Sequence, residues 1–373
     1  MTVPPETWQV GPARIARIVE TGFDVPLATL LPTLPPDAAA SGTATLSVHA
    51  WLVTWPDETG TRQVLVDAGI GNHKTRPSPA FDRLDTPWLA RLEAAGATPS
   101  TITDVLITHL HPDHVGWLTR RVDGQWVPSF PGARVFLPRA GYEFFRSEIG
   151  QAHRNAGLLA DSIEPVVATG QAVFVDASGR PDGGTLPPGF TYLPSPGHSV
   201  DHFSVRLDVA DATVLFAGDV MHQPVQVAHP DHSSMFCADP LQATASRHAM
   251  LALAERSDAL VCSSHFPGPS AGRVVAEGAT YRWRDEPASP GPGWGGGTAS
   301  QTGSAARSRT RKPSSIPSTS PDAPGARITV FDICRIITAT CAARCGSSSG
   351  ADRQSARAIR SRSPARISAR TPD

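Results

Sequence analysis

The chain has 373 residues, a formal net charge of −1 and 40% hydrophobic residues. These values predict one large domain or two smaller ones with a sizeable core. No apolar run reaches the length of a membrane span, and the first twenty residues lack the apolar core of a secretory signal. The five cysteines show neither disulfide spacing nor a C-x-x-C pair. We therefore expect no membrane association and a cytoplasmic protein.

Charge divides the chain into two regions. Residues 288–373 carry 13 Lys and Arg against 4 Asp and Glu, a net of +9, whereas the remainder carries 20 against 30, a net of −10. All 13 histidines lie before Pro267. We predict a catalytic domain over residues 1–286 and a disordered, basic tail over 287–373, because a Gly/Ser/Pro/Arg composition cannot bury a core. A frame-shifted C-terminus is the alternative explanation of the tail.

The first half of the predicted domain alternates strand and helix patterns. Strands over 45–55 and 63–67 flank the turn-forming sequence PDETGT and predict a hairpin, which the glycine-bearing loop DAGIGN follows. Thr86 is the predicted N-cap of a helix with Pro87 in its first turn, and Gly96 is predicted to end that helix. Further strands are predicted over 104–108 and 133–137, and a helix over 139–145.

The second half continues the alternation. Short strands are predicted over 171–176 and 190–193, and a strand pair over 202–207 and 213–216. A helix over 239–256 and a buried strand over 259–263 follow. Interleaved strands and helices predict a layered architecture of sheets and helices.

The sequence LITHLHPDHVGW contains four metal-capable side chains within six residues: His109, His111, Asp113 and His114. A strand that ended there would turn His109 and His111 to the same side, because side chains alternate along a strand. A tight turn at Pro112 would then bring Asp113 and His114 toward a second ion. The alternative, a polar loop after a strand, does not account for this spacing.

Three later residues complete a candidate metal site. His198 follows a Pro-Gly turn, and Asp219 and His265 each follow an apolar strand. The carboxyl ends of strands are where an open sheet presents such groups. Five imidazoles and two carboxylates suit two ions, with three imidazoles on one, two on the other and a shared carboxylate. This ligand set favours Zn(II) and is also compatible with Mn(II), Co(II) or Fe(II).

The order of these motifs resembles the metallo-β-lactamase superfamily. The resemblance covers Ser47 to Val275 and rests on VDAG, THLHPDH, SPGH, AGD and SHFP. It implies an α+β fold, an αββα sandwich in which helices flank two mixed β-sheets. Asp67, in VDAG, would support the metal loop. The resemblance implies three sets of metal ligands: His109, His111 and His198 on the first ion, Asp113, His114 and His265 on the second, and Asp219 between them.

Three segments, DAGIGN, HPDHVGW and SSHFPGPSAGRV, are most similar to the lactonase and methyl-parathion-hydrolase branch of this superfamily. The segment SPGHSVDH departs from the commoner GHTPGH pattern at Val200 and Asp201, while His202 keeps its place as a structural residue. The sequence has no cysteine at position 219, which argues against the lactamases that use a thiolate ligand there.

The expected activity is hydrolysis of a small ester or lactone, similar to an acyl-homoserine lactone. A hydroxide that bridges the two ions would attack the carbonyl carbon, and the metals would stabilise the developing charge. Asp113 is the candidate catalytic residue, as the proton acceptor after attack. Organophosphate triesters and β-lactams are the alternative substrates.

The sequence indicates the substrate-pocket residues and the binding partners less clearly than the metal ligands. Trp117 is a candidate for the wall of the cleft, and Met221, His222, Met235 and Phe236 are candidates for an apolar rim, but ordinary core or loop packing is the favoured interpretation for each. The expected partner is a small-molecule substrate, and a homodimer is left open. The non-enzymatic alternative is a nucleic-acid-associated protein that acts through the basic tail. The complete ligand set favours the hydrolase, because a scaffold has no need of it.

Overall fold

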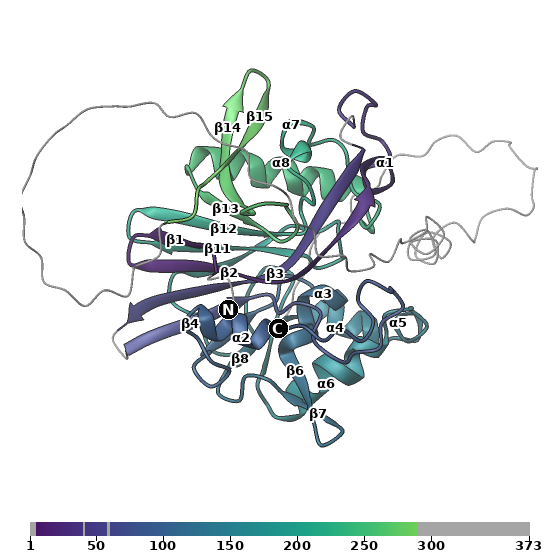
Figure 1. The fold of residues 1–373 in the computed structure, drawn as a ribbon, viewed down its shortest axis with the longest axis vertical. Helices are drawn as coiled ribbons and strands as arrows, with labels where there is room; N and C mark the ends of the chain where they lie inside the picture. The colour runs from purple at the N-terminus through teal and green to yellow at the C-terminus, as the bar shows by residue number, and fades with distance from the viewer. Residues whose placement is uncertain (1–4, 40–41, 58–59, 290–373) are drawn as a thin grey trace, which may run out of the picture.

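Two β-sheets packed face to face form the centre of the protein, with helices on the outer faces (Figure 1). The computed structural model describes residues 5–39, 42–57 and 60–289. Of the predicted tail over 287–373, only residues 287–289 fall among them, so the prediction of a disordered tail lies outside the described residues. No described helix has both the length and the apolar character needed to cross a membrane.

The first sheet has the strand order β1-β2-β3-β4-β5-β8-β9. The strands from β1 to β4 pair antiparallel, and those from β4 to β9 pair parallel. The predicted β3–β4 hairpin is confirmed, whereas the sequence did not predict β1 and β2. The strand bounds are β1 Thr7–Val10, β2 Ala13–Pro26, β3 Thr43–Asp57, β4 Gly60–Val66, β5 Asp104–Leu106, β8 Arg134–Pro138 and β9 Ala172–Val175.

The second sheet has the order β10-β11-β12-β13-β14-β15. Its β12–β13 pair is parallel, and its other pairs are antiparallel. Helix α8 (Pro240–Arg256) connects β12 to β13, so both strands end at the same edge of the sheet. The strand bounds are β10 Phe190–Pro194, β11 Phe203–Val209, β12 Ala212–Gly218, β13 Leu260–Ser263, β14 Ala271–Glu277 and β15 Thr280–Asp285.

Most of the helices are short. The predicted N-cap of α2 (Trp88–Ala94) is wrong: Pro87 holds that position, and the Thr86 N–H donates to Asn72 Oδ1 at 2.8 Å. Gly96 follows this helix with φ +87°, a conformation that suits glycine. The remaining α-helices are α1 Leu27–Leu30, α3 Pro112–Val115, α4 Arg139–Arg146, α5 Glu148–Gln151, α6 Glu164–Ala168 and α7 Val225–Ala228. A 3₁₀ turn spans Gly116–Leu118, and a π-helical turn spans Leu159–Ile163. A separate hairpin consists of β6 Thr119–Val122 and β7 Gln125–Pro128.

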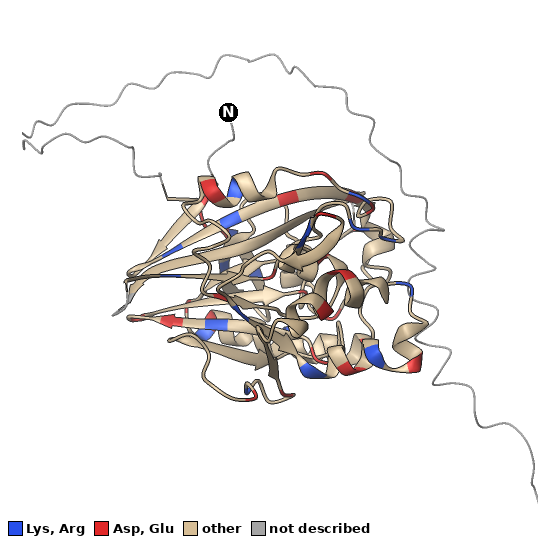
Figure 2. Ribbon diagram, turned by 90° about the horizontal axis from the view of Figure 1, so that it is seen from below, with Lys and Arg blue, Asp and Glu red and all other residues tan. Residues whose placement is uncertain are grey.

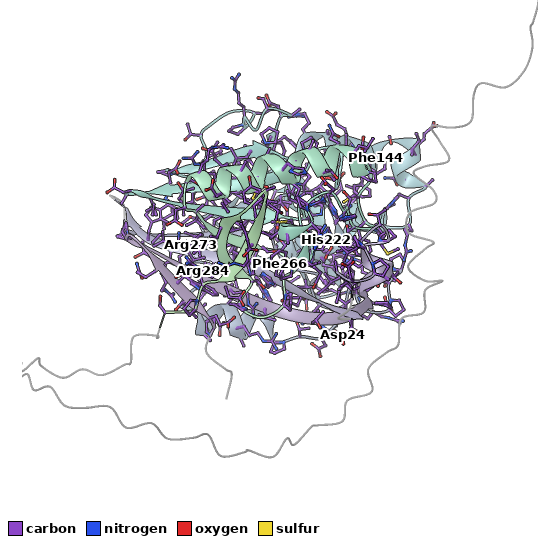
Figure 3. All side chains as sticks on the ribbon, turned by 90° about the horizontal axis from the view of Figure 1, so that it is seen from above. Asp24, Phe144, His222, Phe266, Arg273 and Arg284 are labelled. Carbon is purple, nitrogen blue, oxygen red and sulfur yellow. The ribbon has the colours of Figure 1, made fainter. Side chains whose placement is uncertain are left out.

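The core has three layers, which confirms the predicted αββα sandwich. Aromatic and aliphatic side chains, including Trp51 and Phe216, fill the space between the two sheets. A second cluster, which includes Trp88, lies between the first sheet and its helices. A third, which includes Leu251 of α8 and Phe266, covers the second sheet. Figure 3 marks Phe266 among the side chains. Positive and negative residues lie interspersed over the described ribbon (Figure 2).

Candidate metal centre

The first group of predicted ligands lies in a loop and a short helix, not at the end of a strand. Strand β5 ends at Leu106, so the alternation argument for His109 and His111 is wrong. Instead, the Asp67 carboxylate accepts the Thr108 backbone N–H at 2.8 Å and fixes the start of the loop. Pro112 then begins α3, which brings Asp113 into its first turn.

Gly116 allows this loop to approach the rest of the site. A Cβ atom at this position would lie 1.7 Å from the backbone oxygen of Ile70, so only glycine fits there. The Gly116 N–H donates to the carbonyl of Gly69, and the Ala68 N–H donates to the carbonyl of His114. The DAGIGN loop and the metal-ligand motif are therefore one interlocked unit.

The second sheet supplies the other three predicted ligands from loops at one edge. His198 lies in the turn between β10 and β11, Asp219 directly follows β12, and His265 lies two residues beyond β13. Because β12 and β13 are parallel, their ends bring Asp219 and His265 together. Gly218 adopts φ +56°, and a Cβ there would lie 2.5 Å from His202 Nε2.

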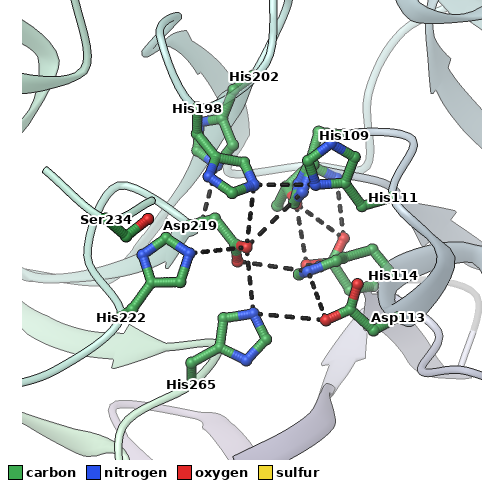
Figure 4. A network of polar contacts seen from close by, with 12 residues as sticks. His109, His111, Asp113, His114, His198, His202, Asp219, His222, Ser234 and His265 are labelled. Carbon is green, nitrogen blue, oxygen red and sulfur yellow. Dashed lines mark hydrogen bonds and ion pairs between the residues drawn. The ribbon is translucent and has the colours of Figure 1, made fainter. Parts of the chain in front are cut away.

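Asp219 lies at the centre of the cluster (Figure 4). Its Oδ2 is 3.1 Å from His265 Nε2, 3.2 Å from His198 Nε2 and 3.8 Å from His109 Nε2. Its Oδ1 faces the other way and lies 3.3 Å from His114 Nε2. The two oxygens of one carboxylate thus face different imidazoles.

The remaining predicted ligands lie around this carboxylate. Asp113 Oδ2 lies 3.6 Å from His265 Nε2 and 3.8 Å from His114 Nε2. His111 Nδ1 lies 2.9 Å from His198 Nε2. The structure thus brings all seven predicted ligands together, and their ligand atoms form two groups, each within 4.8 Å: His109, His111, His198 and Asp219 in one, and Asp113, His114 and His265 in the other.

Three of the imidazoles are oriented through their second ring nitrogen. We assign the Nδ1 proton of His114 to a hydrogen bond with Asp67 Oδ2 at 2.9 Å. His265 Nδ1 donates to the Ser47 carbonyl at 2.8 Å, and His109 Nδ1 donates to Thr108 Oγ1 at 3.0 Å. In the neutral ring, each bond keeps the proton on Nδ1 and leaves the lone pair of Nε2 facing the centre, the arrangement that metal-binding histidines require.

Unpaired polar atoms show that this cluster fits a metal. His109 Nε2, His114 Nε2 and Asp219 Oδ1 are buried and have no hydrogen-bond partner among the described residues. A buried polar atom left in this state costs about 1–3 kcal/mol. Imidazole nitrogens and carboxylate oxygens are ligands that a divalent transition metal accepts, so a cation would satisfy all three atoms.

The charge distribution also suits a cation. Burial lowers the pKa of His111 to about 4 and lowers the pKa values of His109 and His198 well below 6.5, which keeps these rings neutral. Burial alone would raise the pKa of Asp219, but the imidazoles of His265 and the other histidines around it hold that pKa well below the usual range. Burial alone would lower the pKa values of His114 and His265, but the nearby Asp219 carboxylate raises both above 6.5. The site therefore presents three neutral imidazoles, and two that a cation would have to deprotonate, around an ionised carboxylate.

The segment SPGHSVDH supports the site through its last two residues. His202 Nε2 accepts the Asp219 backbone N–H at 2.8 Å, and His202 Nδ1 donates to the Ser195 carbonyl at 3.0 Å. The buried Asp201 carboxylate accepts the backbone N–H of Gly141 in α4. Asp201, one of the two residues that depart from the commoner pattern, thus joins the His198 loop to a helix on the first sheet.

Glu20, a supporting residue that the sequence did not indicate, comes from β2. Its carboxylate accepts the backbone N–H groups of Ile70 and Gly71 at 2.6 and 3.0 Å and Trp117 Nε1–H at 2.8 Å. Burial raises the pKa of Glu20 to about 7. Trp117 is buried and stacks on Trp88 with ring centroids 5.1 Å apart, so it packs in the core, as the favoured interpretation of the sequence expects, and does not form the cleft wall.

The four candidate rim residues lie in three different surroundings. His222 is buried in the polar cluster, with Nε2 3.5 Å from Asp219 Oδ2. Met221 is buried in the core between the second sheet and α8. Met235 and Phe236 are partly buried against a separate apolar cluster around Leu30. The sequence signal for His222 was its position three residues after Asp219.

Comparison with known families agrees with this geometry. The metallo-beta-lactamase superfamily matches residues 44–265, and the chain belongs to that superfamily. Membership places it among metal-dependent hydrolases, as predicted. A comparison with curated proteins gave no match.

Solved structures share the fold at low sequence identity. A hydrolase of the beta-lactamase superfamily, AbOPH, has a TM-score of 0.61 and 21% identity, over 76% of this chain and 97% of its own. AidC, described as a dizinc quorum-quenching lactonase, has a TM-score of 0.61 and 20% identity, over 76% of this chain and 97% of its own. A probable metal-dependent hydrolase from Staphylococcus aureus has a TM-score of 0.61 and 16% identity, over 75% of this chain and 99% of its own. These structures support the fold and leave the substrate open.

Proposed function

We propose that the protein is a dinuclear-metal-dependent hydrolase of a small ester or lactone. The observation that carries this proposal is the position of Asp219, whose Oδ1 faces His114 of one ligand group and whose Oδ2 faces His198 of the other, with His265 also near Oδ2. A carboxylate in that position can be shared by two ions. The proposed ligands are His109, His111 and His198 for the first ion, Asp113, His114 and His265 for the second, and Asp219 for both.

Two divalent ions, most favourably Zn(II), would supply an activated water and polarise the oxygen of the group under attack. The protein's own contribution is orientation. Asp67 and Ser47 hold two of the imidazoles, and burial keeps water from competing for the ligand atoms. Asp113 is the proposed proton acceptor: its side chain is 12% exposed, against 4% for Asp219, so it is the carboxylate that a substrate can reach.

A lactone or other small ester is the preferred substrate because DAGIGN, HPDHVGW and the SSHFPGPSAGRV segment resemble the lactonase branch. The structural neighbour AidC is described in complex with a product, N-hexnoyl-L-homoserine. Both described cysteines, Cys237 and Cys262, are free thiols, which agrees with the proposed cytoplasmic location. Organophosphate triesters and β-lactams are the alternatives to be tested beside the lactones.

The test is a hydrolysis screen of the metal-loaded protein with lactones, organophosphate triesters and β-lactams. We expect about two transition-metal ions per chain, lactone hydrolysis that is lost on chelation and restored by Zn(II), and a large loss of turnover in Asp113→Asn. The surface variant His248→Gln serves as the control, because His248 pairs only with Asp231 at the surface. A folded protein that stays metal-free would refute the dinuclear site, and one that prefers β-lactams would refute the substrate class.

A further inference from the structure

His222 is a buried imidazole with no assigned task. It lies between β12 and α7, and it is 2% exposed. Both of its ring nitrogens are buried and lack a hydrogen-bond partner among the described residues. Its Nε2 faces Asp219 Oδ2 at 3.5 Å, as the close-up of the site shows (Figure 4).

The ring of His222 cannot turn away to find water. Its backbone N–H donates to Gln226 Oε1 at 2.7 Å. The ring stacks on His265, with centroids 5.4 Å apart and planes 11° apart, and Phe236 covers it at 5.8 Å. Arg247, fully buried in α8, anchors the same loop through the Val220 carbonyl at 2.9 Å.

A fold that clamps an unpaired imidazole in this way bears the cost of an unsatisfied polar group unless a bound group pairs with it. The direction of Nε2 indicates where that group lies. Two ligand atoms on one tetrahedral zinc are roughly 3.3–3.5 Å apart, given metal–ligand bonds of about 2.0–2.2 Å. The distance from Asp219 Oδ2 is 3.5 Å to His222 Nε2 and 3.1 Å to His265 Nε2, so both imidazoles are at a separation that a shared ion requires.

We propose that His222 is an eighth metal-binding side chain, which joins Asp219 and His265 on the second ion. The ligand atoms of these three residues lie within 4.8 Å of one another. This inference rests on the metal site of the proposed function.

The test compares metal binding, with no need of a substrate. His222→Phe keeps an aromatic ring for stacking but removes both nitrogens, and His222→Gln keeps a polar side chain. His248→Gln is the matched control, since His248 is half-exposed and pairs with Asp231. For each protein, the affinity for Zn(II) is measured by competition with a chelator, and the visible absorption of the Co(II)-loaded form is recorded.

We expect one of the two ions to bind more than about tenfold more weakly in both His222 variants, with a changed Co(II) absorption, whereas His248→Gln matches the wild type. If His222→Phe fails to fold, His222→Gln decides the question. Unchanged affinity and absorption in a folded variant would overturn the inference, including the case in which only the KM for substrate rises. A wild-type protein that takes up no metal would instead refute the proposed function, before any variant is compared.

Discussion

Replacement of Glu20 by glutamine should change how the stability of the protein depends on pH. The Glu20 carboxylate is 2% exposed and accepts three N–H groups, from Ile70, Gly71 and Trp117. Burial raises its pKa from 4.5 to about 7. Because the pKa in the folded state is the higher one, the folded state binds the proton more tightly than the unfolded chain. The associated stability is complete below about pH 4.5 and is lost as the pH rises through 7.

The magnitude follows from the pKa difference of about 2.5, which corresponds to about 3 kcal/mol in total and about 2–3 kcal/mol between pH 5 and pH 8. In Glu20→Gln this dependence should disappear. The amide keeps one oxygen for Gly71 and Trp117 but turns an NH₂ group toward the Ile70 N–H, at a cost of about 1 kcal/mol at every pH. The variant should therefore be slightly less stable than the wild type at pH 5 and more stable at pH 8.

The assay is urea unfolding of both chelator-treated proteins, followed by tryptophan fluorescence at several pH values from 5 to 8.5. Other titrating groups are common to both proteins and cancel in the difference between them. Parallel pH profiles would show that Glu20 does not titrate in this range and would refute the reasoning.

Three further changes test the site and the boundary of the domain. Asp219→Ala should lower the binding of both ions, whereas His265→Ala should weaken mainly one, as elemental analysis after limited chelation would show; equal effects would argue against a shared carboxylate. Asp67→Asn should weaken metal binding about 10–100-fold, because the carboxylate that orients His114 is lost, and an unchanged affinity would contradict that role. A chain cut after Ser289 should fold and bind metal like the full chain, since the Ser289 N–H still donates to the first strand at 2.7 Å; an insoluble or metal-free product would show that later residues complete the fold.

The ligands were predictable because their spacing is local. Four of them occupy six consecutive positions, and Asp219 and His265 follow strands whose side chains are mostly buried, so apolar runs indicate those two. His198 was indicated by the Pro-Gly turn before it. The reason given for His109 and His111 was nevertheless wrong, since the strand ends at Leu106 and a carboxylate from another loop shapes the turn. Sequence spacing thus identified the chemistry of the loop but not its conformation.

Strand β2 and the proposed metal-binding role of His222 could not be predicted from the sequence, for a different reason. Strand β2 carries charged residues such as Arg14, Arg17 and Glu20, which interrupt the apolar alternation expected of a half-buried strand. All three have partners from distant segments: Arg14 donates to the Ala95 carbonyl, Arg17 donates to Ser270 Oγ, and Glu20 accepts the Ile70 N–H. His222 likewise depends on Gln226 and on packing that no short stretch of sequence specifies. A buried polar side chain of this kind can be recognised only once the structure shows the distant residues that it contacts.

His265 is joined to the opposite sheet by two backbone-directed bonds. The Ser47 N–H donates to the His265 carbonyl at 3.1 Å, and the His265 ring donates to the Ser47 carbonyl at 2.8 Å. The first and last ligands of the centre are 156 positions apart in the chain, from 109 to 265, and they meet only after both sheets have docked. If these residues bind two ions as proposed, uptake of both ions would be a late event in folding, because a chain still short of residue 265 lacks one of the proposed ligands. Metal binding would then stabilise a fold that has already formed and would not initiate folding.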